Sequence, residues 1–118
     1  MKRSLVVLAA AAALAAPAGA AAPRIALSPT SVHRGQVVRV HGVIHGCPAG
    51  DTVTLLSKAF SHRHEFAGVP AVFARVGASG AYSVRTRIPA RRRPGSYHVT
   101  GRCGGGNLGV APLLRVLR

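Results

Sequence analysis

Apolar and polar residues alternate along several short stretches of this chain, and that period of two is typical of β-strands with one buried face. Residues 81–88, AYSVRTRI, are one example, with Tyr82 and Val84 on one side and Arg85 and Arg87 on the other. No stretch of the mature part has the length and 3.6-residue period of a helix. The expected strands are 24–28, 36–43, 52–56, 71–76, 81–88, 95–103 and 108–117.

The same alternation predicts which side chains form the core. In residues 36–43, Val38 and Val40 face one side, whereas Arg39 and His41 face the other. The residues expected to be buried are Val38, Val40, Val53, Leu55, Tyr82, Val84, Ile88, Val99, Leu114 and Val116. Arg85, Arg87 and Arg102 are expected to face solvent.

Turn-forming residues separate the expected strands. GASG at 77–80 has the size and composition of a hairpin loop, and Pro112 fits a strand break or a sheet edge. Residues 57–70, SKAFSHRHEFAGVP, have no clear period. They form the longest expected loop, in which a short edge strand is an open alternative.

The first 20 residues have the pattern of a secretory signal peptide. Lys2 and Arg3 precede an apolar run, and small residues follow with A-x-A spacing, which favours cleavage after Ala20. The apolar run is too short to span a bilayer comfortably, although a retained anchor helix is the alternative. Residues 21–118 then form one domain.

The mature chain contains two cysteines, Cys47 and Cys103. Disulfides persist outside the cytoplasm, so an exported chain predicts a bond between these two residues. We place them on strands of opposing sheets, facing inward. Two buried free thiols are the alternative.

Two segments carry a family resemblance, LSPTSVHRGQVVRVHGVIHGCPAGDTVTL at 27–55 and VGASGAYSVRTRIPARRRPGSYHVTGRC at 76–103. Their Pro-containing first strand, their Gly-aromatic strand ending in Ile-Pro and their Pro-Gly-x-Tyr before a cysteine resemble immunoglobulin-like domains of small secreted actinobacterial proteins. The resemblance implies an immunoglobulin-like two-sheet antiparallel sandwich of about seven strands. The chain lacks the tryptophan that packs on the disulfide of antibody domains.

Positive charge is the unusual global property of the chain. The formal net charge is +14, and removal of Lys2 and Arg3 leaves 14 basic residues against Asp51 and Glu65, a net +12. Such a charge attracts anionic lipid headgroups and phosphate polymers, although an arginine-rich composition typical of a GC-rich genome is the alternative explanation. Nucleic acid is not expected as a partner, because the chain is exported and lacks aromatic side chains on which bases could stack. The expected basic surface consists of Arg85, Arg87, Arg91, Arg92, Arg93 and Arg102.

The histidines are weak evidence for a metal site, and the two carboxylates are weak evidence for a catalytic site. His62 and His64 have the spacing that aligns two imidazoles on one strand face, but a site needs further ligands, so these histidines are more simply explained as exposed loop residues. With Asp51 and Glu65 as the two acids, paired-carboxylate chemistry would require them to meet. We expect no catalytic, cofactor or metal site.

The sequence therefore predicts a secreted, non-enzymatic binding or adhesion module that associates with the anionic cell envelope. A small-ligand carrier resembling chromophore-binding apoproteins, which are also small exported sandwiches, is one alternative. Those apoproteins have two disulfides and an open cleft, whereas this chain can form one disulfide. A histidine-based metal protein is the other alternative. An arginine face, an apolar cleft or converging imidazoles would distinguish the three functions.

Overall fold

The computed structural model describes residues 22–104 and 106–118, which form strands and loops. The expected signal peptide, residues 1–20, lies outside the described residues. Within the described ranges, no helix is long and apolar enough to cross a membrane. The expected all-β class is confirmed for this part of the chain.

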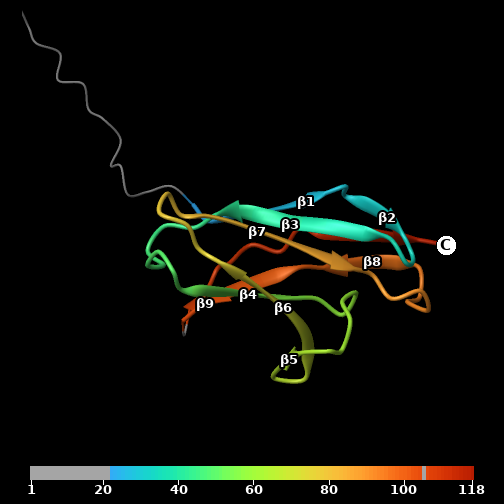
Figure 1. Ribbon diagram of the computed structural model, residues 1–118. Helices are drawn as coiled ribbons and strands as arrows, with labels where there is room; N and C mark the ends of the chain where they lie inside the picture. Colours follow the sequence, from blue (N-terminus) through green and yellow to red (C-terminus); the bar gives the residue numbers. More distant parts are fainter. Residues whose placement is uncertain (1–21, 105) are drawn as a thin grey trace, which may run out of the picture.

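The described residues contain eleven strands, several of them very short (Figure 1). The strands are β1 (Arg24–Ser28), β2 (Ser31–His33), β3 (Val37–Val43), β4 (Thr52–Leu56), β5 (Glu65–Phe66), β6 (Val69–Arg75), β7 (Ala81–Arg87), β8 (Gly95–His98), β9 (Thr100–Cys103), β10 (Gly106–Asn107) and β11 (Leu113–Leu117). The first five expected strands match β1, β3, β4, β6 and β7 to within two residues. The unassigned segment 57–70 contains the short edge strand β5.

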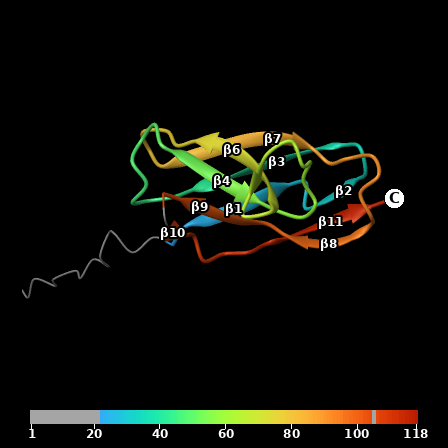
Figure 2. The ribbon, with the colours of Figure 1, turned by 90° about the horizontal axis from the view of Figure 1, so that it is seen from below.

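The strands form three hydrogen-bonded sheets that pack as two layers (Figure 1). The first layer has the strand order β1-β3-β7. The second layer combines the orders β2-β11-β8 and β10-β9-β4-β6-β5, because β8 and β9 follow each other along one run of chain (Figure 2). All strand pairs are antiparallel except β2 with β11, which is parallel.

Two expected strands differ from the structure because their hydrogen-bond partners change along the chain. Residues 95–103 form two strands, interrupted at Val99, since β8 pairs with β11 and β9 pairs with β4. The last strand begins at Leu113 and not at 108. The preceding Pro112 accepts from the Val99 amide, 2.9 Å away, but has no N–H to donate to the ladder. The segment Ser31–His33, which lies outside the expected strands, forms the short strand β2.

The core lies between the two layers and confirms most of the predicted side-chain directions. Nine of the ten expected core residues are buried, and Val84 is partly buried against them. Arg85 and Arg87 are exposed as expected, whereas Arg102 is half-buried. Phe60, from the loop that precedes β5, is fully buried and was not predicted.

The predicted disulfide joins Cys47 to Cys103. Cys103 ends β9, but Cys47 lies in the loop between β3 and β4, so the expected placement on strands of opposing sheets is wrong. The bond fastens this loop to β9, the neighbour of β4 in its sheet. Closing a loop of 56 residues stabilises the fold by about 4 kcal/mol in the chain-entropy model.

Tyr82 ties the three strands of the first layer together. Its hydroxyl donates to the Arg24 carbonyl, 2.8 Å away, across the central strand β3. The residue opposite Tyr82 on β3 is Gly42, and a Cβ there would lie 1.8 Å from the Arg24 oxygen. Glycine therefore provides the space in which the hydroxyl reaches β1.

Burial raises the pKa of Tyr82 to about 12, which predicts a loss of stability in alkali. Above pH 10 the unfolded chain releases the phenolic proton, whereas the folded chain retains it, so the free energy of unfolding should fall by about 2 kcal/mol by pH 11.5. Urea unfolding of wild type and Tyr82→Phe at pH 8 and pH 11.5 measures this effect. Tyr82→Phe should lose much less stability over that interval. Equal losses in the two proteins would contradict the assignment.

Candidate functional site

Arginines gather on the outer face of the first layer. Arg24 on β1, Arg39 on β3, and Arg85 and Arg87 on β7 are exposed, because their neighbours in each strand turn inward. Arg39 lies directly opposite Arg85 in the β3–β7 register. We call these four arginines, together with the half-buried His41 between them, the arginine face.

Neutral groups position two side chains of the arginine face. The Nη1 of Arg39 donates to the Ser83 hydroxyl, 3.3 Å away. The Nη1 of Arg87 donates to the Gly35 carbonyl, 2.6 Å away. These hydrogen bonds hold the guanidinium groups over the sheet but do not neutralise their charge.

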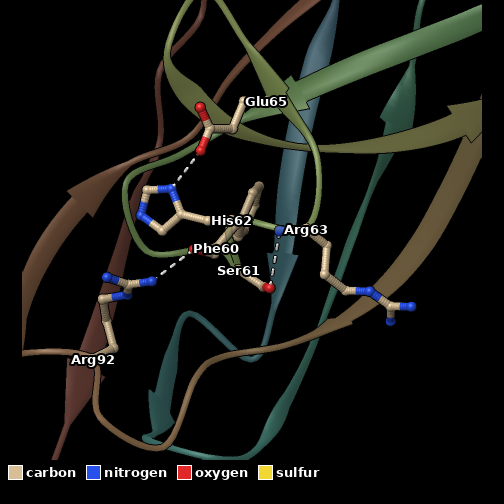
Figure 3. Close-up of polar contacts among 6 residues, drawn as sticks. All are labelled: Phe60, Ser61, His62, Arg63, Glu65 and Arg92. Carbon is tan, nitrogen blue, oxygen red and sulfur yellow. Dashed lines mark hydrogen bonds and ion pairs between the residues drawn. The ribbon is translucent and has the colours of Figure 1, made fainter.

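The two acidic residues of the sequence lie elsewhere. Glu65 is on β5, where its Oε2 lies 2.9 Å from Nδ1 of His62 (Figure 3). Asp51 is in the β3–β4 loop, where a carboxylate oxygen lies within 4.8 Å of the sulfurs of Cys47 and Cys103. Among the described residues, the arginine face therefore has no Asp or Glu side chain, since the sequence contains only these two.

The three arginines at 91–93 differ in their surroundings. Arg91 and Arg93 are exposed in the turn between β7 and β8. Arg92 is half-buried, and it donates from Nε to the Ala59 carbonyl at 3.2 Å and from Nη2 to the Phe60 carbonyl at 2.8 Å (Figure 3). Arg92 thus anchors the loop that carries the buried Phe60 ring.

Arg102 lies apart from the arginine face. It is on β9 in the second layer, where its guanidinium carbon lies 5.2 Å from the centroid of the Phe66 ring. Its β4 neighbour Thr54 alternates with the core residues Val53 and Leu55, so this side of the sheet faces away from the first layer. The six arginines of the expected basic surface therefore do not share one face.

Sequence reasoning found half of the arginine face. The alternation in 36–43 already turned Arg39 and His41 outward, but only the pairing of β3 with β7 joins them to Arg85 and Arg87. The alternation of Ile25 and Leu27 in residues 24–28 also turns Arg24 outward, but only the pairing of β1 with β3 places it on this face. The strand register brings these residues together.

The histidines do not converge on a metal site within the described residues. His62 contacts Glu65, His64 packs on the Phe73 ring with centroids 5.4 Å apart, and His41 Nε2 lies 2.9 Å from the Ser28 hydroxyl. The single cluster with metal-ligand types is Cys47, Asp51 and Cys103, whose two sulfurs already form the disulfide. Burial lowers the pKa of His41, and the nearby Arg39 lowers it further.

A second feature is a hollow of about 420 Å³ where the second layer divides. The β4–β9 pairing ends at Leu56 and Thr100, beyond which the chain after β4 lies on one side of the hollow and β8 on the other. The lining surface is mainly apolar. The residues that line it are Leu56, Ser57, Lys58, Val69, Ser96, Tyr97, His98 and Thr100.

The layers and the strand order define a β-sandwich protein. No family model matches the sequence, and no curated protein matches it. Among solved structures, macromomycin is similar with a TM-score of 0.53 and 15% sequence identity. The likeness covers 81% of this chain and all of macromomycin, and it concerns the fold.

Replacing Arg92 should destabilise the fold, although it belongs to a charged turn. Arg92→Gln removes two charge-assisted hydrogen bonds to carbonyls beside the buried Phe60, which should cost about 2 kcal/mol. The matched control Arg91→Gln removes the same charge from an exposed side chain and should stay within about 0.5 kcal/mol of wild type. Urea unfolding at neutral pH compares the two. Equal stability of both variants would contradict the anchoring role.

Proposed function

We propose that this chain is a secreted, non-enzymatic binding protein that attaches through its arginine face to anionic groups of the cell envelope. The proposal depends mainly on one observation. Among the described residues, one sheet face has four exposed arginines and no Asp or Glu side chain. The disulfide supports export, because such bonds persist in oxidising compartments. The proposal includes residues 1–20 as a cleaved signal peptide and 21–118 as an immunoglobulin-like domain, which is supported by the two-layer strand order.

The electrostatics of the arginine face favour an extended anionic partner. Like charges directly opposite each other on neighbouring strands are unfavourable, and Arg39 faces Arg85 in this way. An anion held between them relieves the repulsion. Each arginine near an anionic surface contributes about 1 kcal/mol within a Debye length of about 8 Å, so several together suffice for attachment without a shaped pocket.

The positions of the acidic residues support a non-enzymatic role. Glu65 pairs with Pro70 at the start of β6, whereas Asp51 accepts a hydrogen bond from Val76, just after the end of the same strand. The two carboxylates therefore belong to opposite ends of β6. Acid–base catalysis by a carboxylate pair requires both groups beside one substrate bond.

Removing charge from the arginine face should weaken attachment more than removing equal charge elsewhere. The variant Arg39→Gln/Arg85→Gln loses two facing cations and should bind vesicles of 30% phosphatidylglycerol in phosphatidylcholine roughly thirtyfold more weakly at 20 mM salt. The matched control Arg115→Gln/Arg118→Gln alters β11 and the residue after it, in the other layer, and should change binding much less. Vesicle co-sedimentation at 20 mM and 500 mM salt measures both. Equal weakening would mean that net charge alone causes binding.

A small-ligand carrier is the second candidate, and the apolar hollow between β4 and β8 favours it. Its volume of about 420 Å³ is within the range of ligand pockets. Lys58 and His98 add polar groups at its border. The likeness to macromomycin supports only the sandwich fold that both candidates share.

Filling the hollow should abolish binding of an apolar probe if the carrier function is present. The uncharged dye N-phenyl-1-naphthylamine should gain fluorescence with wild type and bind at least about tenfold more weakly to Ser96→Trp, because the indole occupies the hollow. The matched control Ser83→Trp places the same ring on the outer face of the first layer. Absence of a fluorescence gain with wild type, or equal binding by the two variants, would exclude this candidate.

A further inference from the structure

A small depression lies at the end of the arginine face, beside the end of β6. Its volume is about 370 Å³, and side chains from three strands line it. Arg39 and His41 come from β3, Ser83 comes from β7, and Arg75 ends β6. We call this depression the Arg39–Arg75 notch.

The notch presents several hydrogen-bond donors to one place. Each guanidinium has five N–H donors, and the hydrogen bond from Arg39 to the Ser83 hydroxyl uses one of them. Because Ser83 accepts that bond, its own hydroxyl proton can be directed elsewhere. Arg75 is exposed, and within residues 22–104 and 106–118 its side chain has no hydrogen bond or ion pair.

Cations are concentrated in the notch without a counter-ion from the protein. Arg39 and Arg75 are both charged at neutral pH. Asp51, whose carbonyl accepts the Val76 amide next to Arg75, has its carboxylate near the disulfide sulfurs. The lowered pKa of His41, caused by burial and then by Arg39, fits a cationic surrounding.

We propose that the Arg39–Arg75 notch binds a single phosphate group, with the two guanidinium groups and the Ser83 hydroxyl donating to its oxygens. Guanidinium forks match the geometry of phosphate oxygens, and hydroxyls complete such sites. The inference rests on the proposed function, because the notch would be the point at which the arginine face holds a phosphate of a lipid headgroup or of a phosphate polymer. It adds a defined ligand chemistry to a surface that otherwise acts by charge alone.

His41 reports on the notch without having to contact the ligand. A bound phosphate near the ring stabilises the imidazolium and so raises the pKa of His41. Ser28 on β1 contacts this ring, and Arg39 is the charge that acts on it. Ser83 on β7 and Arg75 on β6 line the same notch as His41. His98, which lies on β8 in the other layer, is an internal control.

NMR titration of the histidine ring protons in the oxidised mature chain, with inorganic phosphate replacing chloride at constant ionic strength, tests the site. Phosphate should raise the pKa of His41 and leave that of His98 unchanged. Arg75→Gln should weaken phosphate binding about tenfold, because it removes a donor that the fold does not use. The control Arg115→Gln should bind as wild type does. An unchanged His41, or equal affinity of the two variants, would overturn the site.

Vesicles separate failure of the notch from failure of the proposed function. If phosphate binds as expected and phosphatidylglycerol vesicles bind Arg75→Gln more weakly than Arg115→Gln, the headgroup phosphate is a ligand of the notch. If phosphate binds as expected but vesicles do not distinguish these variants, free or polymeric phosphate is the ligand. If phosphate does not bind at the notch while Arg39→Gln/Arg85→Gln still weakens vesicle binding, the phosphate site is wrong and the proposed role of the arginine face is supported. If phosphate does not bind and Arg39→Gln/Arg85→Gln does not weaken vesicle binding, both the phosphate site and the proposed attachment through the arginine face are wrong.

Discussion

The register between β3 and β7 is the constraint on which the rest of the structure depends. It pairs Val40 with Val84 on the core side and Arg39 with Arg85 on the solvent side. A slip of one residue would exchange the two sides and bury arginines without partners, at a cost of several kcal/mol each. The Tyr82 hydroxyl helps to fix this register, because it reaches the Arg24 carbonyl only past Gly42. The same pairing that builds the core therefore also builds the arginine face.

A second constraint is that the run 95–103 serves two sheets. Its first half pairs with β11 and its second half with β4, and the change occurs at Val99, whose side chain is fully buried. One run of chain with two partners holds the second layer together, yet the pairing of β4 with β9 ends at Leu56. The apolar hollow lies at this point of divergence. The two candidate sites thus arise from different features, register in the first layer and strand divergence in the second.

Alternation along the chain was enough to predict the class of the fold and most of the core, because side-chain direction in a strand is a local property. What it could not predict depends on contacts between distant segments. Phe60 packs in the core while Arg92, 32 residues later, holds its carbonyl, and residues 57–70 have no periodic pattern that predicts either contact. Likewise, alternation predicted that Arg102 points outward. It did not predict that Arg102 lies on the second layer, because that depends on the order of the strands in the sheets. A local sequence pattern predicts toward which side of a strand a side chain points, but not which residues it contacts there.

The facing pair Arg39 and Arg85 breaks a rule that the rest of the fold obeys. Elsewhere the local preferences agree with the global structure: valines point inward, glycine stands where a side chain would clash, and Arg92 is held by carbonyls. A pair of like charges on neighbouring strands costs stability without any gain in the isolated chain. Departures from local consistency that bring no structural gain are expected at functional sites. The two acidic side chains lie at the disulfide and in the β5 hairpin, away from this pair. Under the proposed function, an anionic group of the bound partner compensates the two charges.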